Sequence, residues 1–153
     1  MNNKWNAVGS AAHNDIQAMI EVATLASDVG SSVSVVSCNE FQGSNGNRTE
    51  FCIGGPGGGS NPRTGAHLAA HLPGVTIRPY DPKRRDSMAI IVGKQKFLYD
   101  RDNQQHALIA KFRPVESTQP AIVISGQTSI ANHAAVSFLK REYLSISRCP
   151  FTG

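Results

Sequence analysis

The sequence predicts an α/β protein, a three-layer sandwich of the Rossmann-like or flavodoxin-like kind with a mainly parallel sheet. Three segments, 5–29, 51–72 and 121–142, each lead from a short β-type run through a loop into a helical pattern, and such units imply parallel strands joined by crossover helices. Residues 88–112 instead hold three β-type runs with gaps too short for a helix, which predicts an antiparallel insertion. We expect a single domain spanning 1–153.

Composition fits a globular chain that stays in the cytoplasm. Of the 153 residues, 40% are hydrophobic and 17% are charged. No run approaches the roughly 18 apolar residues of a membrane-spanning helix, and the first residues lack the apolar segment of a secretory signal. We therefore expect a cytoplasmic location and no membrane partner.

The charge and the cysteine content limit which binding partners, metal sites and disulfides we expect. The net charge of +4 permits a phosphate-bearing partner, but the basic residues are spread out except at 83–85, which argues against nucleic-acid binding. The cysteines are odd in number and form no CxxC pair, which argues against a zinc site and a disulfide framework. Cys38 and Cys52 lie in apolar runs and are expected to be buried thiols.

The first part of the chain predicts a strand, a helix and a second strand. Residues 5–8 form a weak β-type run, and Asn14 is placed as the N-cap of a helix that ends near Gly30. Apolar residues recur at helical spacing and predict the buried face of this helix; they are Ile16, Met19, Ile20, Ala23 and Ala26. The alternating, Val-rich segment 32–38 predicts a strand.

A Gly-rich loop at the centre of the chain predicts a ligand site. A short strand, 51–53, enters a loop with five of the chain's 14 glycines, and Asn61-Pro62 opens a helix that runs to residue 72. Without side chains, the loop lets a ligand approach the main chain, and the positive end of the helix favours an anion there. Neither GxxxxGK[ST] nor a complete GxGxxG is present, and a plain connecting turn is the alternative.

The second half predicts mostly strands, followed by one helix. Short strands are expected at 75–78, 88–92, 96–99 and 106–112, the last three as an antiparallel meander. The almost wholly apolar run 121–124 predicts a strand covered on both faces. A helix is expected at 129–142, and a final edge strand at 144–148.

In a parallel sheet of this kind, ligands bind outside the carboxyl ends of the strands, so the loops 9–15, 54–64 and 125–129 should gather at one edge. Main-chain N–H groups and a guanidinium there would hold phosphate or carboxylate oxygens. We expect a small anionic ligand, a nucleotide above all, with no other cofactor and no metal. The predicted ligand-binding residues are Asn14, Gly54, Gly55, Gly57, Gly58, Asn61, Arg63, Thr64, Ser125, Gly126, Gln127 and Thr128. The two asparagines could instead be helix caps alone, and the arginine a solvated first-turn residue.

The same edge could carry catalysis. His13 can exchange a proton near neutral pH, Asp15 could orient it or accept from a ribose hydroxyl, and Glu40 could supply a second carboxylate. The Gly-x-Ser-x-Gly nucleophile elbow is absent. His67 and His71 lie four apart, but without the glutamate of HExxH they predict helix surface rather than a metal site.

Three short motifs also carry a resemblance to a known family: Asp15 at the start of the first helix, Ile53-Gly54-Gly55-Pro56 with Asn61 after it, and Ile124-Ser125-Gly126 before an Ala-rich helix. Together they resemble an uncharacterised Rossmann-like bacterial domain found in signalling and conflict (immune-type) proteins. The resemblance implies a nucleotide- or ligand-handling effector or sensor domain that sits beside regulatory modules.

Three functions therefore stay open at this point. The leading hypothesis is a small-anion-binding, nucleotide-type domain in bacterial signalling or defence. The second is a nucleotide hydrolase or NAD-type glycosidase that uses Asp15 or Glu40 with His13. The third is an interaction module in which the meander, 88–112, pairs edge to edge with a second copy or another protein.

Overall fold

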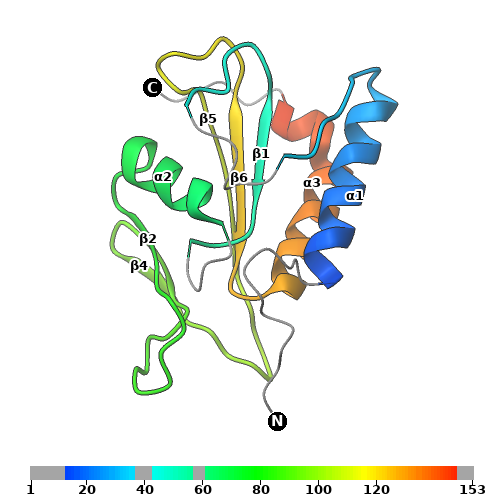
Figure 1. The fold of residues 1–153 in the computed structure, drawn as a ribbon. Coiled ribbons are helices and arrows are strands. Elements are labelled where there is room, and N and C mark those ends of the chain that lie inside the picture. The colour runs from blue at the N-terminus through cyan, green and yellow to red at the C-terminus, as the bar shows by residue number, and fades with distance from the viewer. Residues whose placement is uncertain (1–12, 37–42, 57–60, 148–153) are drawn as a thin grey trace.

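The computed structural model describes residues 13–36, 43–56 and 61–147, which form a mixed α/β structure with three helices and two small sheets (Figure 1). The elements in chain order are α1 (His13–Asp28), β1 (Glu50–Ile53), α2 (Pro62–His71), β2 (Val75–Ile77), β3 (Ile90–Val92), β4 (Gln95–Phe97), β5 (Ala107–Phe112), β6 (Ala121–Gly126) and α3 (Ser129–Ser147).

The larger sheet, sheet A, has the strand order β1-β6-β5. β1 runs parallel to β6, with Glu50 opposite Ala121 and Ile53 opposite Ile124. β5 runs antiparallel to β6. Within the described residues sheet A is therefore mixed, and the expected mainly parallel sheet is not observed.

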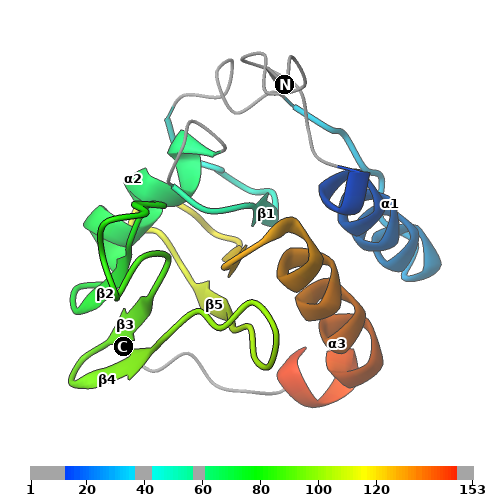
Figure 2. The ribbon, with the colours of Figure 1, turned by 90° about the horizontal axis from the view of Figure 1, so that it is seen from below.

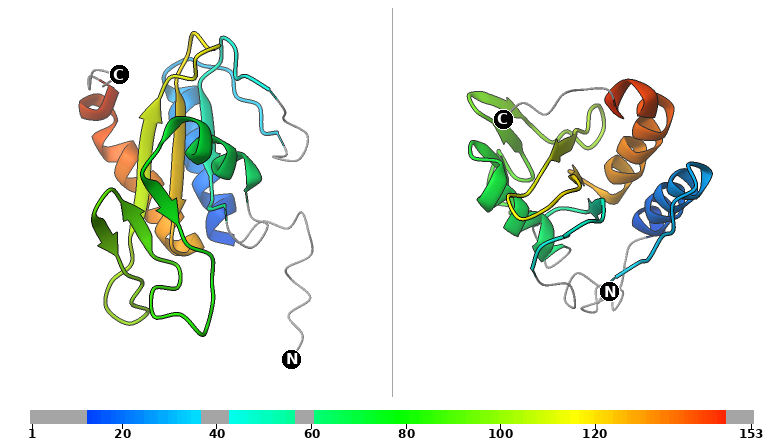
Figure 3. Two further views of the ribbon diagram at one scale, coloured as in Figure 1. Left: turned by 90° about the vertical axis from the view of Figure 1, so that its left-hand side faces the viewer. Right: turned by 90° about the horizontal axis from the view of Figure 1, so that it is seen from above.

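The helices lie on both faces of sheet A. α1 and α3 pack side by side on one face, and α2 lies on the other face together with the smaller sheet (Figures 1, 2 and 3). α1 and α3 are also joined by polar contacts, because Glu21 accepts hydrogen bonds from His133 and Ser137 at 2.8 and 3.0 Å. Within the described residues, none of these helices combines the length and the apolar character needed to cross a membrane.

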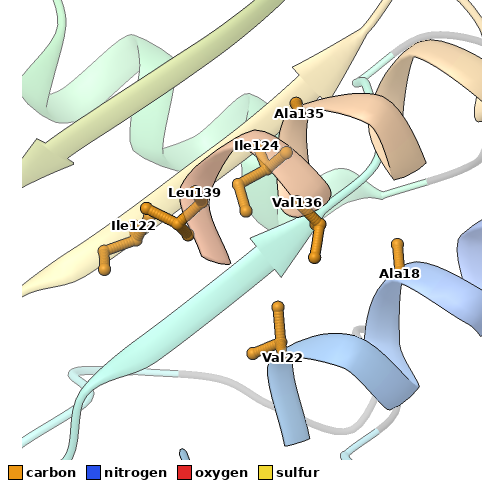
Figure 4. Close-up of a cluster of buried hydrophobic side chains, with 7 residues drawn as sticks. All are labelled: Ala18, Val22, Ile122, Ile124, Ala135, Val136 and Leu139. Atoms are coloured by element: carbon orange, nitrogen blue, oxygen red, sulfur yellow. The ribbon is translucent and has the colours of Figure 1, made fainter. Parts of the chain in front are cut away.

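The main core lies between β6 and the pair α1 and α3 (Figure 4). Ile122 and Ile124 of β6 point into it, and the helices contribute the other side chains: Ala18, Val22, Ala135, Val136 and Leu139. The predicted buried face of α1 is therefore wrong. Ile16 and Ile20 are 42% and 60% exposed, because α1 turns its small residues toward α3 and so lets the two helices pack closely.

The smaller sheet, sheet B, is the antiparallel meander β2-β3-β4. Gly93, with φ +58°, makes the two-residue turn between β3 and β4, a backbone conformation that side chains disfavour. The predicted meander is thus corrected at one end. Residues 107–112 are not part of sheet B but pair with all six residues of β6. This ladder is longer than any that the three-residue strands of sheet B could form.

Two predicted strands are absent from the described residues. Residues 31–36 have no strand structure, and Val35 is 72% exposed; their alternation has the right propensity, but no neighbouring strand pairs with them. Residues 144–147 continue α3 rather than form an edge strand. Neither Gly nor Pro interrupts 127–149, so the helix can keep satisfying its own backbone.

The other elements agree with the sequence. The strands before the Gly-rich loop and before residue 126, and the helices that follow each of them, are confirmed. Two parallel strand–loop–helix units are therefore present. The predicted strand 5–8 and the buried state of Cys38 lie outside the described residues, whereas Cys52 is buried as expected, at 4% exposure.

We predict that Ile124→Ala destabilises the protein by about 2–5 kcal/mol, because it leaves a cavity in the centre of the core. Ile130→Ala is the matched control, since Ile130 lies on α3 with 61% exposure and should change the free energy of unfolding by less than about 0.5 kcal/mol. Urea unfolding measures both. Equal effects would contradict the position of the core.

Candidate functional site

The carboxyl ends of β1 and β6 lie side by side, so the loops that follow them share one edge of sheet A. The N–H of Gly54 continues the ladder by donating to the carbonyl of Ile124 at 2.9 Å. Gly54 has φ +104°, which turns the chain away from the sheet in a conformation open to glycine. The sequence-predicted meeting of these two loops is thus confirmed.

Asn61 and Thr64 fasten the Gly-rich loop to the start of α2. The Asn61 side-chain oxygen accepts from the N–H groups of Arg63 and Thr64, and its amide donates to the carbonyl of Ile53 at 2.9 Å. The Thr64 hydroxyl donates to the carbonyl of Gly54 at 2.8 Å. Asn61 is therefore a helix cap, the alternative left open by the sequence, and both side chains are committed to the fold.

Ser125 differs from these residues because its hydroxyl is buried without a hydrogen-bond partner among the described residues. A β-carbon at Gly55 would lie 3.2 Å from its Oγ, so the main chain of the Gly-rich loop passes close to the hydroxyl and a side chain at this position would crowd it. A buried, unpaired hydroxyl costs about 1–3 kcal/mol. This cost makes Ser125 the most informative polar group at the edge.

Gly126 and Asn132 hold the start of α3 against the end of β6. A β-carbon at Gly126 would lie 2.6 Å from the backbone nitrogen of Asn132, so only glycine fits. The Asn132 side chain accepts from the N–H of Gly126 and donates to Asp15 at 2.8 Å. The first turn of α1 is thereby brought to the same edge, as predicted, and the carboxylate of Asp15 is hydrogen-bonded there.

Gln127 and Thr128 face the connection between sheets A and B. The Gln127 side chain accepts from the N–H of His106 at 2.7 Å and donates to the carbonyl of Phe97 at 3.0 Å. The Thr128 hydroxyl donates to Gln105 and accepts from the N–H of Ala131. Both predicted ligand-binding side chains are therefore occupied by contacts within the fold.

Arg63, predicted to bind the anion, instead pairs with Glu50 at the opposite end of β1. Its guanidinium makes two hydrogen bonds to the carboxylate, at 2.7 and 3.0 Å. Two more groups donate to that carboxylate, His67 at 3.2 Å and the thiol of Cys52 at 3.1 Å. Burial alone would raise the pKa of Glu50, but hydrogen bonds from His67, Arg63 and Cys52 outweigh it and lower the pKa from 4.5 to about 2.

The remaining predicted site residues are dispersed. His13 is exposed and its ring contacts Gln17 at 3.3 Å. Asn14 lies inside the first turn of α1, which begins at His13, so it is not the N-cap. Glu40, Gly57 and Gly58 lie outside the described residues. Among the described candidates, no catalytic pair of His13 with Asp15 is formed.

A shallow groove of about 410 Å³ begins beside the Gly-rich loop. Pro56 lies at its start, and the groove continues between α2 and β2 over an apolar lining that includes Leu68, Leu72, Val75 and Ile77.

Comparison with protein-family models, curated sequences and solved structures finds no match.

Sequence reasoning missed the roles of four residues: Asn132 at the carboxyl edge of sheet A, and Glu50, Cys52 and His67 toward the amino end of β1. The sequence could have indicated the role of Asn132, since an asparagine amid alanines inside a helix is disfavoured unless its side chain is hydrogen-bonded. It could also have indicated that Glu50 and Cys52 lie together, because residues two apart in a strand share a face. His67, expected at the surface, is buried at 4% exposure and meets both of them.

We predict that Glu50→Gln lowers the free energy of unfolding at pH 7 by about 1–3 kcal/mol, because it leaves Arg63 and His67 without their carboxylate. The folded-state pKa of Glu50 is depressed, so its stabilisation is present above about pH 4.5 and is lost as the pH falls toward 2.

Urea unfolding at pH 7 and at pH 3 measures the difference, which should shrink at the lower pH. Glu142→Gln, at an exposed position of α3, is the control and should show almost no effect at either pH. A Glu50→Gln difference that is the same at both pH values would contradict the assigned charge state.

Proposed function

We propose that this protein binds a small anionic ligand of the nucleotide class at the carboxyl edge of sheet A. The observation that carries the proposal is the buried Ser125 hydroxyl, which has no partner among the described residues and faces Gly55. An oxygen of a phosphate or carboxylate would accept this hydrogen bond and remove the cost of the unpaired group.

Two further features support an anion rather than a neutral ligand. α2 and α3 both begin at this edge, and the amino end of a helix carries partial positive charge. The apolar groove from Pro56 along α2 suits a base, while the phosphate lies near Ser125. The combination of a polar anchor and an apolar wall is typical of small-molecule sites.

The wider role follows the resemblance noted from the sequence. We propose that sheet A with its helices is the core of a Rossmann-like three-layer sandwich, and that ligand binding serves bacterial signalling or defence. A neighbouring regulatory domain or a second copy of the chain would then read out the bound state.

Binding is favoured over turnover by the contacts of the candidate acid and base. Asp15 is hydrogen-bonded to Asn132, and His13 contacts Gln17. Edge-to-edge assembly through β4 of sheet B is disfavoured, because Lys96 lies on this outer strand and Lys94 lies in the turn before it, and lysine at an edge opposes further pairing.

Thermal unfolding with a panel of nucleotides, dinucleotides, inorganic phosphate and pyrophosphate tests the proposal. A ligand at 100 times its dissociation constant should stabilise the fold by about 2.7 kcal/mol. If the groove holds the base, nucleotides will stabilise more than phosphate or pyrophosphate at equal concentration. Chromatography of each mixture shows whether the bound compound is also cleaved.

We predict that Ser125→Ala weakens binding of the identified ligand by about 10–150-fold, the value of a hydrogen bond to a charged group. The same variant should be at least as stable as the wild type without ligand, because it removes an unpaired buried hydroxyl. Calorimetric titration and urea unfolding measure the two effects.

Ser117→Ala is the matched control, since Ser117 is a buried serine whose hydroxyl is hydrogen-bonded to Asn45 and Ser44. It should lose about 1–3 kcal/mol of stability and bind the ligand as the wild type does. If no compound of the panel raises the melting temperature, or if Ser125→Ala binds the ligand as the wild type does, the proposed site is refuted.

A further inference from the structure

Glu50, Cys52 and His67 bring three different metal-ligating groups together on the α2 side of β1. One carboxylate oxygen, the thiol sulfur and one imidazole nitrogen all lie within 4.8 Å of one another. Cys52 and His67 are each 4% exposed. Glu50 and Cys52 share a strand face, and His67 reaches them from the second turn of α2.

The spacing of these atoms suits a tetrahedral metal ion. The carboxylate of Glu50 is 3.1 Å from the sulfur and 3.2 Å from the imidazole nitrogen. Ligand atoms on one zinc ion are about 3.3–3.6 Å apart, given metal–ligand bonds of about 2.0–2.3 Å. The two short distances end on different oxygens of the carboxylate, so coordination of one ion by all three groups requires a side-chain shift within a cluster whose ligand atoms lie within 4.8 Å of one another.

The hydrogen bonds border the region where the ion would sit. The thiol of Cys52 donates to Oε1 of Glu50, and Nε2 of His67 donates to Oε2. A divalent ion between them would replace both hydrogens: the Cys52 proton leaves to solvent, and the imidazole of His67 binds through Nε2 and carries its ring proton on Nδ1. The mixed sulfur, nitrogen and oxygen set favours zinc over magnesium or calcium, which prefer oxygen alone.

Arg63 limits the affinity of the site. Its guanidinium binds both oxygens of the Glu50 carboxylate, at 2.7 and 3.0 Å, and also interacts with Cys52, so it must shift when an ion reaches these ligands. Its positive charge also repels the ion. The next histidine, His71, stacks on Phe112 with ring centroids 5.1 Å apart and is not part of the three-residue group.

We propose that Glu50, Cys52 and His67 form a zinc-class metal site that clamps α2 to β1. The site is separate from the anion site, because it lies toward the amino end of β1 and uses none of the residues at Ser125 and Gly55. Metal binding would stabilise the packing of α2.

Cobalt(II) titration of the chelator-treated protein is the direct test. We expect one equivalent to bind, with a thiolate-to-cobalt charge-transfer band in the near ultraviolet that zinc abolishes by competition. Cys52→Ser should lose this band and His67→Gln should weaken binding at least tenfold. Affinity should rise with pH, because the thiol proton is released.

His71→Gln is the matched control, since it changes a histidine on the same helix face and should keep both the band and the affinity. The wild-type protein gives a test that needs no variant: zinc should raise the melting temperature of the chelator-treated protein, and chelator should reverse it. Absence of the band, or a band that survives Cys52→Ser, would overturn the proposal.

Discussion

The burial of β6 is the constraint on which the rest of the structure depends. β6 is the central strand of sheet A, and Ala121, Val123, Ile124 and Ser125 have no exposed surface. A strand buried on both faces must receive its hydrogen bonds from strands on both edges and its packing from helices on both sides. β1, β5 and α3 are placed by this requirement, and α1 is placed by its packing on α3.

The same constraint explains why polar groups at the end of β6 are so well paired. Where a buried strand stops, its last backbone groups need partners from the loops. The side chain of Asn132 accepts a hydrogen bond from the N–H of Gly126, and that of Asn61 donates to the carbonyl of Ile53 at the end of the neighbouring strand β1. The side chain of Gln127 accepts from the N–H of the residue before β5. Against this background the Ser125 hydroxyl stands out, since the side chains of Asn61, Gln127 and Asn132 around it all have partners.

Local patterns in the sequence were enough to predict the strand–loop–helix units at 51–72 and 121–142, because capping residues, glycines and apolar runs act on neighbouring residues. They were not enough to choose partners between distant segments. The segment 31–36 has β propensity, but among the described residues no strand pairs with it. β5 pairs with β6 and not with β3 and β4, the strands nearest to it in the sequence. The site shows the same limit. The sequence predicted that the loops after β1 and β6 meet, but it did not predict the ion pair of Arg63 with Glu50, because that pair depends on how α2 crosses β1.

The parallel pairing of β1 with β6 has a consequence for how the chain folds during synthesis. Glu50 pairs with Ala121, so β1 waits for its neighbour while about 70 residues are made, which takes about 4–14 s at roughly 5–20 residues per second. Sheet B, whose three strands lie within 75–97, needs no such delay. The nascent protein would therefore hold a completed small hairpin sheet while its central layer is still open, and this interval is when the apolar faces of β1 and α1 most need protection from aggregation.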